Sequence, residues 1–214
     1  MIRKYDPDVF HHHPKGIVRW VENHRTSAVL RCIDARPEHA VLDVGCGTGI
    51  ILSQVKSQQR VGIDLSRYMV SRARERLGAS AQILLGDAEE LPFPSQSFDR
   101  VIASSLFSHV LHPDRVAAEL KRVLKPGGRI VVSVSDEEQI EKGMRIARWL
   151  FLDRWILGPT GEVRVYNVEY HLHKFSCKRM RDLLGGGGLV ERTVKRVPTV
   201  LFPVHWVAIY EHKV

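Results

Sequence analysis

The hydrophobic positions of this chain fall into short continuous runs that alternate with longer segments of helical spacing. Apolar runs typical of buried strands lie at 40–44, 60–63, 81–85, 98–104, 129–135, 190–197 and 204–211. Segments with apolar residues three or four positions apart lie at 16–35, 50–56, 66–77, 113–124 and 174–184, and these predict helices. The alternation favours an α/β fold in which a mostly parallel, seven-stranded sheet is covered on both faces by helices.

Three segments interrupt this alternation. Pro126-Gly127-Gly128 predicts a turn between a helix and the strand that follows it. The run Gly185 to Gly188 follows a helix and precedes a strand, which is the reverse of the order in a phosphate-binding loop, so we expect a connector. From Asp136 to about Lys174 the pattern loosens into an aromatic and basic stretch. We expect substrate specificity to reside there.

The size and composition fit one globular domain. The chain has 214 residues with 44% hydrophobic and 26% charged residues. Its cysteines, Cys32, Cys46 and Cys177, lie far apart, so neither a disulfide framework nor a metal site is expected, and a reducing cytoplasm fits best. His11-His12-His13 is expected to be a polar loop or lid, because adjacent histidines need ligands from elsewhere to hold a metal. The net charge of +8 favours anionic partners.

A glycine-rich turn carries the strongest chemical signal. The strand at 40–44 runs into Gly45-Cys46-Gly47-Thr48-Gly49, and glycines at that place let a ligand approach the backbone. Asp64 ends the next strand, about 20 residues further on, where an acid would hold ribose hydroxyls. A nicotinamide cofactor is disfavoured, because the third glycine of its G-x-G-x-x-G pattern would fall on Ile50.

The turn with Asp43 just before it resembles the first motif of the class I S-adenosylmethionine-dependent methyltransferases. The resemblance runs from 41 to 134 and includes the segments 86–93, 97–99 and 120–128 in the order of that family. It is similar to the subgroup that contains ubiquinone and menaquinone biosynthesis methyltransferases. The resemblance implies a Rossmann-like fold and S-adenosyl-L-methionine as cofactor, with S-adenosyl-L-homocysteine as product.

The family's cofactor contacts are implied at strand ends and in the turns that follow them. Carried over to this chain they are Asp43, Gly45, Cys46, Gly47, Gly49, Asp64, Leu65, Met69, Asp87, Ala88 and Ser104. The glycine turn would approach the methionine part, with Ser104 beside it and Asp43 orienting the turn or the amino group. At each position the alternative is a residue that only caps backbone groups.

The other contacts would hold the adenosine part. Asp64 would accept both ribose hydroxyls in a charge-assisted arrangement. Leu65 and Met69 would touch the adenosine. Asp87 would accept the adenine amino group, and the backbone N–H of Ala88 would donate to a ring nitrogen.

Methyl transfer is an in-line displacement that depends mainly on holding donor and acceptor close and aligned. A general base is needed only for poorly activated acceptors. We rank His109 first because it follows the strand end that would face the transferred methyl. The other candidates are His112, Tyr166, Tyr170, His171 and His173, and a structural role is the alternative for each.

Four possible functions follow from these features. The leading hypothesis is a methyltransferase for a small-molecule or lipid-like acceptor, motivated by apolar side chains at Trp149, Phe151, Trp155 and Ile156. The alternative is an RNA (tRNA or rRNA) methyltransferase, motivated by the basic clusters Arg72, Arg74, Arg76 and Lys178, Arg179, Arg181. A cofactor-binding protein without transferase activity is the third, and a nicotinamide oxidoreductase ranks below it.

The chain divides into four regions on this interpretation. Residues 1–39 are expected to form an N-terminal helical cap and 40–135 the cofactor-binding core. Residues 136–173 form the variable substrate region, and 174–214 a C-terminal helix and strand pair. No apolar run approaches the roughly 18 residues of a membrane-spanning helix, so a protein without a transmembrane segment is expected.

Overall fold

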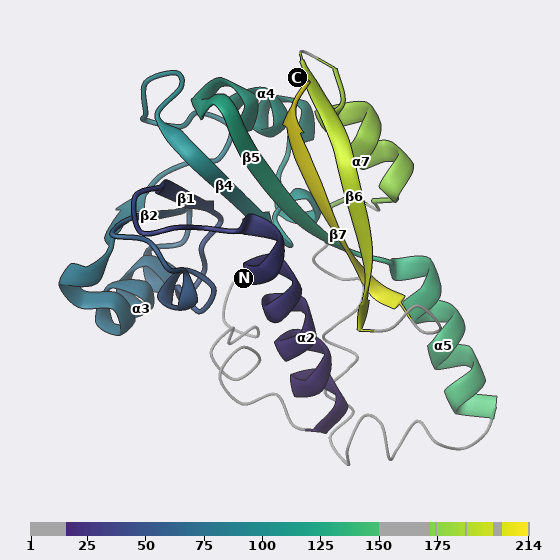
Figure 1. The fold of residues 1–214 in the computed structure, drawn as a ribbon. Helices are drawn as coiled ribbons and strands as arrows, with labels where there is room; N and C mark the ends of the chain where they lie inside the picture. The colour runs from purple at the N-terminus through teal and green to yellow at the C-terminus, as the bar shows by residue number, and fades with distance from the viewer. Residues whose placement is uncertain (1–15, 150–171, 174, 187, 199–202, 214) are drawn as a thin grey trace.

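A seven-stranded sheet forms the centre of the computed structural model, which describes residues 16–149, 172–173, 175–186, 188–198 and 203–213 (Figure 1). The strands are β1 (Ala40–Val44), β2 (Gln59–Asp64), β3 (Gln82–Leu85), β4 (Phe98–Ser104), β5 (Leu124–Ser135), β6 (Leu189–Pro198) and β7 (Pro203–His212). Their order is β3-β2-β1-β4-β5-β7-β6. The first five are parallel, and β7 is antiparallel to both neighbours, β5 and β6. The predicted fold class is confirmed.

Helices cover both faces of this sheet. On one face lie α2 (Gly16–Ile33) and α3 (Arg67–Leu77), and on the other lie α4 (Pro113–Val123) and α7 (Cys177–Leu184). Figure 1 shows α2 crossing in front of the sheet with α4 and α7 behind it. Among the described residues, no helix has the length and apolar character that crossing a bilayer requires.

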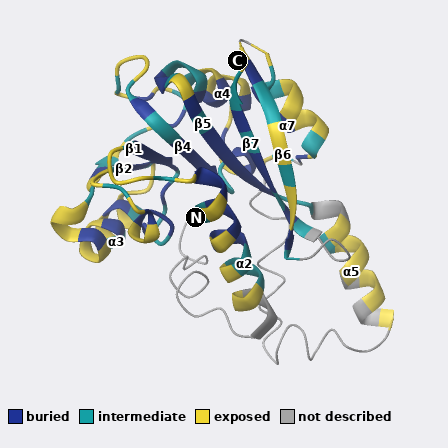
Figure 2. Cartoon of the chain, viewed as in Figure 1, coloured by how far each residue is buried: buried dark blue, intermediate teal, exposed yellow. Residues whose placement is uncertain are grey.

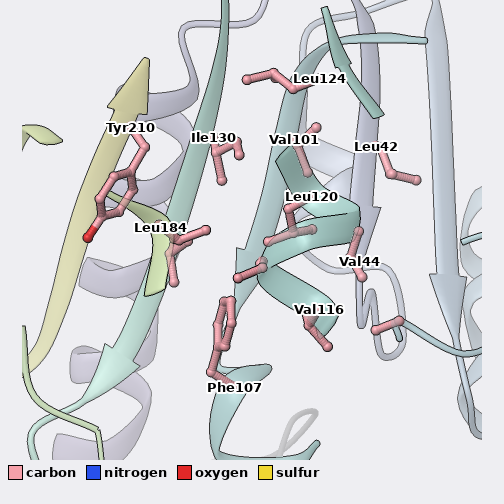
Figure 3. Close-up of a cluster of buried hydrophobic side chains, with 14 of the residues drawn as sticks. Leu42, Val44, Val101, Phe107, Val116, Leu120, Leu124, Ile130, Leu184 and Tyr210 are labelled. Carbon is pink, nitrogen blue, oxygen red and sulfur yellow. The ribbon is translucent and has the colours of Figure 1, made fainter. Parts of the chain in front are cut away.

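Burial on both faces explains why the strands read as continuous apolar runs. On the face covered by α4 and α7, Leu42 and Val101 pack with Leu120 and Leu184 in one buried cluster (Figure 3). Alternate strand residues such as Val41 point to the opposite face, toward α2 and α3. The central strands β1, β4 and β5 are accordingly mostly buried, whereas the edge strand β6 is mainly exposed or intermediate and the outer sides of the helices are exposed (Figure 2).

The prediction of a helix at 50–56 is wrong. Only a short 3-10 turn at Leu52–Gln54 follows β1. Ser53 Oγ and Gln54 Nε2 both donate to the carbonyl oxygen of Ile50, at 2.8 and 3.0 Å. These side-chain bonds compete with the backbone bonds that would continue a helix, so the chain turns directly toward β2.

Two further expectations are corrected. Residues 126–128 do not separate α4 from the next strand as a turn but lie within β5, where pairing with β4 skips from Leu124 to Arg129. An unexpected helix, α5 (Glu137–Trp149), follows β5. Its start is signalled by Asp136, whose carboxylate accepts from the backbone N–H of Gln139 at 3.1 Å, as an N-cap does. The run Gly185–Gly188 connects α7 to β6 as expected.

Candidate active site

The glycine turn after β1 adopts backbone angles that favour glycine. Gly45, Gly47 and Gly49 have φ values of +70°, +53° and +77°. A Cβ on Gly45 or Gly49 would lie 2.8 or 2.7 Å from a leucine side chain, so protein packing already excludes larger residues there. A Cβ on Gly47 would meet no atom of the described chain within 4 Å. The turn is therefore open at Gly47, and a ligand can approach the backbone on that side.

Asp64, at the end of β2, joins this turn to the start of α3. Its Oδ2 accepts from the backbone N–H of Gly47 at 2.9 Å, and its Oδ1 accepts from that of Ser66 at 2.9 Å. Leu65 is 71% exposed and Met69 is half-buried. The carboxylate thus has the backbone-capping role, and it lies beside an exposed apolar side chain that can cover a flat ring.

Asp87 lies at the same edge of the sheet, after β3. The pairing of Asp64 with Leu85 places the ends of β2 and β3 side by side. Asp87 is exposed and its Oδ1 accepts from the backbone N–H of Glu89 at 2.9 Å, whereas Ala88 is buried. The two acids therefore end neighbouring strands, as a site at the carboxyl edge requires.

Among the acids at the carboxyl edge of the sheet, Asp43 is more deeply buried than Asp64 and Asp87. It is 1% exposed, and its Oδ2 has no hydrogen-bond partner within the part of the chain that the structure describes. Burial, reinforced by the charge of Asp64, raises the pKa of Asp43 to about 8, although Arg25 opposes the shift. Burial also raises the pKa of the adjacent Cys46 thiol, which is therefore no reactive thiolate. A buried acid short of a partner fits a ligand with a cationic group.

Ser104 ends β4 and belongs to a hydrogen-bonded group that the sequence did not reveal. Its hydroxyl lies 2.8 Å from that of Ser133 on β5 and accepts from Arg25 Nη1 at 2.6 Å. Ser105, which follows it, has a φ of +55° and accepts from the same nitrogen at 3.0 Å. Arg25 and its partner Glu22 come from α2, about 80 residues earlier. The helix is therefore connected to the strand end that borders the predicted site.

The candidate histidines differ in their surroundings. His109 is exposed in the 3-10 turn Phe107–His109 that follows β4. His112 instead pairs with Glu89, from Nδ1 to Oε2 at 2.7 Å, and its backbone N–H donates to the same carboxylate, which lowers the pKa of Glu89. His173 contacts the carbonyl oxygen of Leu111 at 3.3 Å. The candidates His11, His12, His13, Phe151, Trp155, Ile156, Tyr166, Tyr170 and His171 lie outside the described residues.

Both basic clusters are partly used within the chain. Arg74 and Arg76 donate to the backbone carbonyls of Ile83 and Thr48, at 2.8 and 2.9 Å. In the second cluster, Arg181 pairs with Glu191 at 2.7 Å and Arg179 lies over the Phe175 ring. These contacts account for much of the clustering without a nucleic-acid partner.

The fold and these residues together define a class. At the carboxyl edge of the sheet lie the glycine turn, Asp64, Asp87 and Ser104. At the same edge the strand order reverses, because β2 and β3 lie on one side of β1 and β4 lies on the other. Open α/β sheets bind nucleotide-like ligands at this reversal of strand order. The chain therefore has the architecture of a Rossmann-like ligand-binding protein.

Comparison with known proteins makes the class specific. Residues 42–132 match the family of methyltransferase domains. This segment is thus similar to methyltransferase domains, and the resemblance predicted from its motifs is confirmed.

Two curated relatives and one solved structure illustrate the similarity. The chain is 42% identical over 98 residues to a phosphatidylethanolamine N-methyltransferase of Cereibacter sphaeroides, covering 43% of this chain and 48% of the relative. It is 39% identical over 106 residues to a demethylmenaquinone methyltransferase of Symbiobacterium thermophilum, covering 45% and 42%. The match thus spans less than half of either relative. An S-adenosylmethionine-dependent methyltransferase from Aquifex aeolicus shares the fold, with a TM-score of 0.67, 21% identity and coverage of 97% and 98%.

Proposed function

We propose that this protein transfers a methyl group from S-adenosyl-L-methionine to a small-molecule or lipid-like acceptor. The proposal rests mainly on Asp64. Its Oδ2 accepts from the backbone N–H of Gly47 at 2.9 Å, and this contact fixes the glycine turn beside its open side. A nucleoside cofactor with an amino-acid tail needs an acid for its ribose and an accessible backbone for its tail. The methyltransferase domain match over 42–132 supports the same cofactor.

Each strand end has a role in this proposal. The carboxylate of Asp64, besides fixing the turn, would accept the ribose hydroxyls, and exposed Leu65 would cover the adenosine. Asp87 and the backbone of Ala88 would hold the adenine. The open side of Gly47 would admit the methionine part, whose cationic amino group suits the buried carboxyl of Asp43.

The bound cofactor would supply an electrophilic methyl group on a sulfonium. The task of the chain is then to hold the acceptor in line and to exclude water from it. His109 follows the end of β4 and is exposed, so it is the described residue that we propose as base for an acceptor that must lose a proton.

Apolar side chains beside the end of β4 support an apolar acceptor. Leu111 is 69% and Leu172 is 55% exposed, and the backbone N–H of Leu172 donates to the carbonyl oxygen of Ser108 at 2.7 Å. We propose that residues 136–173 select the acceptor at this side. The two curated relatives are named for the acceptors phosphatidylethanolamine and demethylmenaquinone, and both of these molecules are lipid-like.

A transfer assay with labelled S-adenosyl-L-methionine tests the acceptor class. Lipid extract, a small-metabolite fraction and total RNA are offered separately to the wild-type protein and to Asp64→Asn. We expect label in the lipid or metabolite fraction, unaffected by ribonuclease, and none with the variant. Label in RNA that ribonuclease releases would instead establish the alternative acceptor class.

A further inference from the structure

The helix α5 carries a stripe of exposed side chains in its last two turns. Lys142, Arg145, Ile146 and Trp149 are all exposed, and their spacing of three and four positions places them on one face of the helix. Ile146 is 57% exposed and Trp149 is 78% exposed. Large apolar side chains that lie together on a surface mark an interaction site, whereas isolated ones do not. The stripe is therefore a candidate for an interaction surface.

The opposite side of α5 holds the helix on the sheet. Ile140 is half-buried and lies nine residues before Trp149, which at about 3.6 residues per turn puts the two on opposite sides of the helix. The backbone N–H of Asp136 donates to the carbonyl oxygen of Val204 at 2.9 Å, and Trp206 Nε1 donates to Asp136 Oδ2 at 2.6 Å. These bonds fix the start of α5 to β7, from which the helix extends away from the sheet (Figure 1). The stripe accordingly faces solvent.

The helix α5 begins at the same edge of the sheet as the candidate active site. It follows Ser135, the last residue of β5, and the parallel strands β1, β4 and β5 end at this edge. The exposed side chains of Leu111 and Leu172 lie beyond the end of β4, on the same edge. A partner that binds α5 therefore lies on the side of the molecule where we propose that the acceptor binds.

The charges of α5 select the kind of partner. Its acidic residues, Glu137, Glu138 and Glu141, lie in the first half of the helix, whereas Lys142 and Arg145 stand beside the two exposed apolar side chains. An anionic lipid surface offers phosphate groups above an apolar layer, and tryptophan is favoured at that boundary. The net charge of +8 acts in the same direction. A nucleic acid would bind the cations but offers no apolar layer for an aliphatic side chain.

We propose that the last two turns of α5 dock on an anionic phospholipid surface. Ile146 and Trp149 enter the boundary between headgroups and acyl chains, and Lys142 and Arg145 lie at the level of the phosphates. The inference goes beyond the proposed function, because docking requires neither the cofactor nor methyl transfer. It also gives a lipid-like acceptor a way to reach the protein without crossing water.

Binding of the full chain to vesicles tests this surface in the absence of cofactor. Phosphatidylcholine vesicles with and without phosphatidylglycerol are sedimented with the protein, and the bound fraction gives the affinity. We expect the wild type to bind the phosphatidylglycerol vesicles and to bind phosphatidylcholine alone much more weakly. Trp149→Ala should weaken binding roughly tenfold, because less apolar area enters the surface. Arg145→Glu should weaken it roughly tenfold or more, and high salt should reduce that difference.

Two exposed residues elsewhere serve as matched controls. Leu85→Ala changes the end of β3, the edge strand farthest from α5 in the strand order, and Arg31→Glu reverses a charge in the last turn of α2. Both should bind within about threefold of the wild type, and Trp149→Phe, which keeps an aromatic ring, should retain most of the affinity. Circular dichroism confirms that each variant is folded.

Three results would overturn the inference. The first is a folded wild type that does not bind phosphatidylglycerol vesicles, and the second is equal affinity in the wild type and Trp149→Ala. The third is an equal loss in Arg145→Glu and Arg31→Glu, which would show attraction by net charge without a docking face. The transfer assay with labelled S-adenosyl-L-methionine tests the proposed function separately, so the failure of one does not imply the failure of the other.

Discussion

Two glycines of this chain share a positive φ but differ in their surroundings. Gly47 in the glycine turn and Gly78 after α3 have φ values of +53° and +52°. At both, an added Cβ would meet no described atom within 4 Å. Gly47 lies beside the proposed cofactor, whereas Gly78 lies at the far end of α3. The pair therefore separates backbone strain from ligand exclusion.

We expect Gly47→Ala and Gly78→Ala both to lose stability, about 1 kcal/mol or more each, since alanine is disfavoured at positive φ. Gly47→Ala alone should weaken S-adenosyl-L-homocysteine binding, because its methyl group fills the space that the ligand needs. Urea denaturation and calorimetric titration measure the two effects. Equal ligand affinity in both variants would show that the open side of Gly47 does not face the cofactor.

Asp43 predicts a pH dependence of the ligand-free protein. Its pKa, about 8 when folded against 3.8 ordinarily, means that the folded state holds the proton more tightly. Its contribution to stability is therefore full below about pH 4 and is lost as the pH rises through about 8. Asp43→Asn cannot ionise, so its unfolding free energy relative to wild type should rise between pH 5 and 8, by at most about 1.4 kcal/mol per pH unit. Urea denaturation without cofactor measures this; a constant difference would contradict it.

Among the helices, α2 is hydrogen-bonded to the sheet near its C-terminus and again near its middle. Near its C-terminus, Arg129 Nη1 donates to the carbonyl of Cys32 at 2.7 Å and Arg100 to that of Ile33. Cations at the C-terminal end of a helix satisfy its free carbonyls and favour its dipole. Arg25 adds a contact nearer the carboxyl edge. The helix is therefore fixed in orientation as well as packed.

Arg129→Met should lower the free energy of unfolding by about 1–3 kcal/mol, because a charge-assisted bond to a partly buried carbonyl is lost and Glu211 loses the nearer of its two arginine partners. Arg192→Met is the control, since Arg192 pairs with the same Glu211 at 3.4 Å and is more exposed. We expect that change to stay within about 0.5 kcal/mol. Equal losses in urea denaturation would show that the contact with α2 contributes nothing.

For the whole molecule, the strand pattern was predictable because parallel strands buried on both faces are continuous apolar runs. The position of β7 between β5 and β6 was not, since an antiparallel neighbour is chosen by tertiary contacts. The glycine turn, Asp64 and Asp87 could be proposed as site residues from the sequence because local motifs mark them. The hydrogen bonds of Arg25 to Ser104 and Ser105 could not be predicted, because these partners lie 79 and 80 residues away and leave no local pattern. The helix expected at 50–56 does not form, because side-chain hydrogen bonds to the carbonyl oxygen of Ile50 compete with the helix, and helix propensity does not include such bonds.

We propose that the carboxyl edge of this sheet binds S-adenosyl-L-methionine through Asp64. The most direct test is calorimetric titration of the wild type and Asp64→Asn with S-adenosyl-L-homocysteine, with NAD as control ligand and Glu75→Gln as an exposed-acid control on α3. We expect binding by wild type and Glu75→Gln, much weaker binding by folded Asp64→Asn, and no binding of NAD. Failure of the folded wild type to bind the homocysteine ligand, or equal affinity in Asp64→Asn, would contradict it.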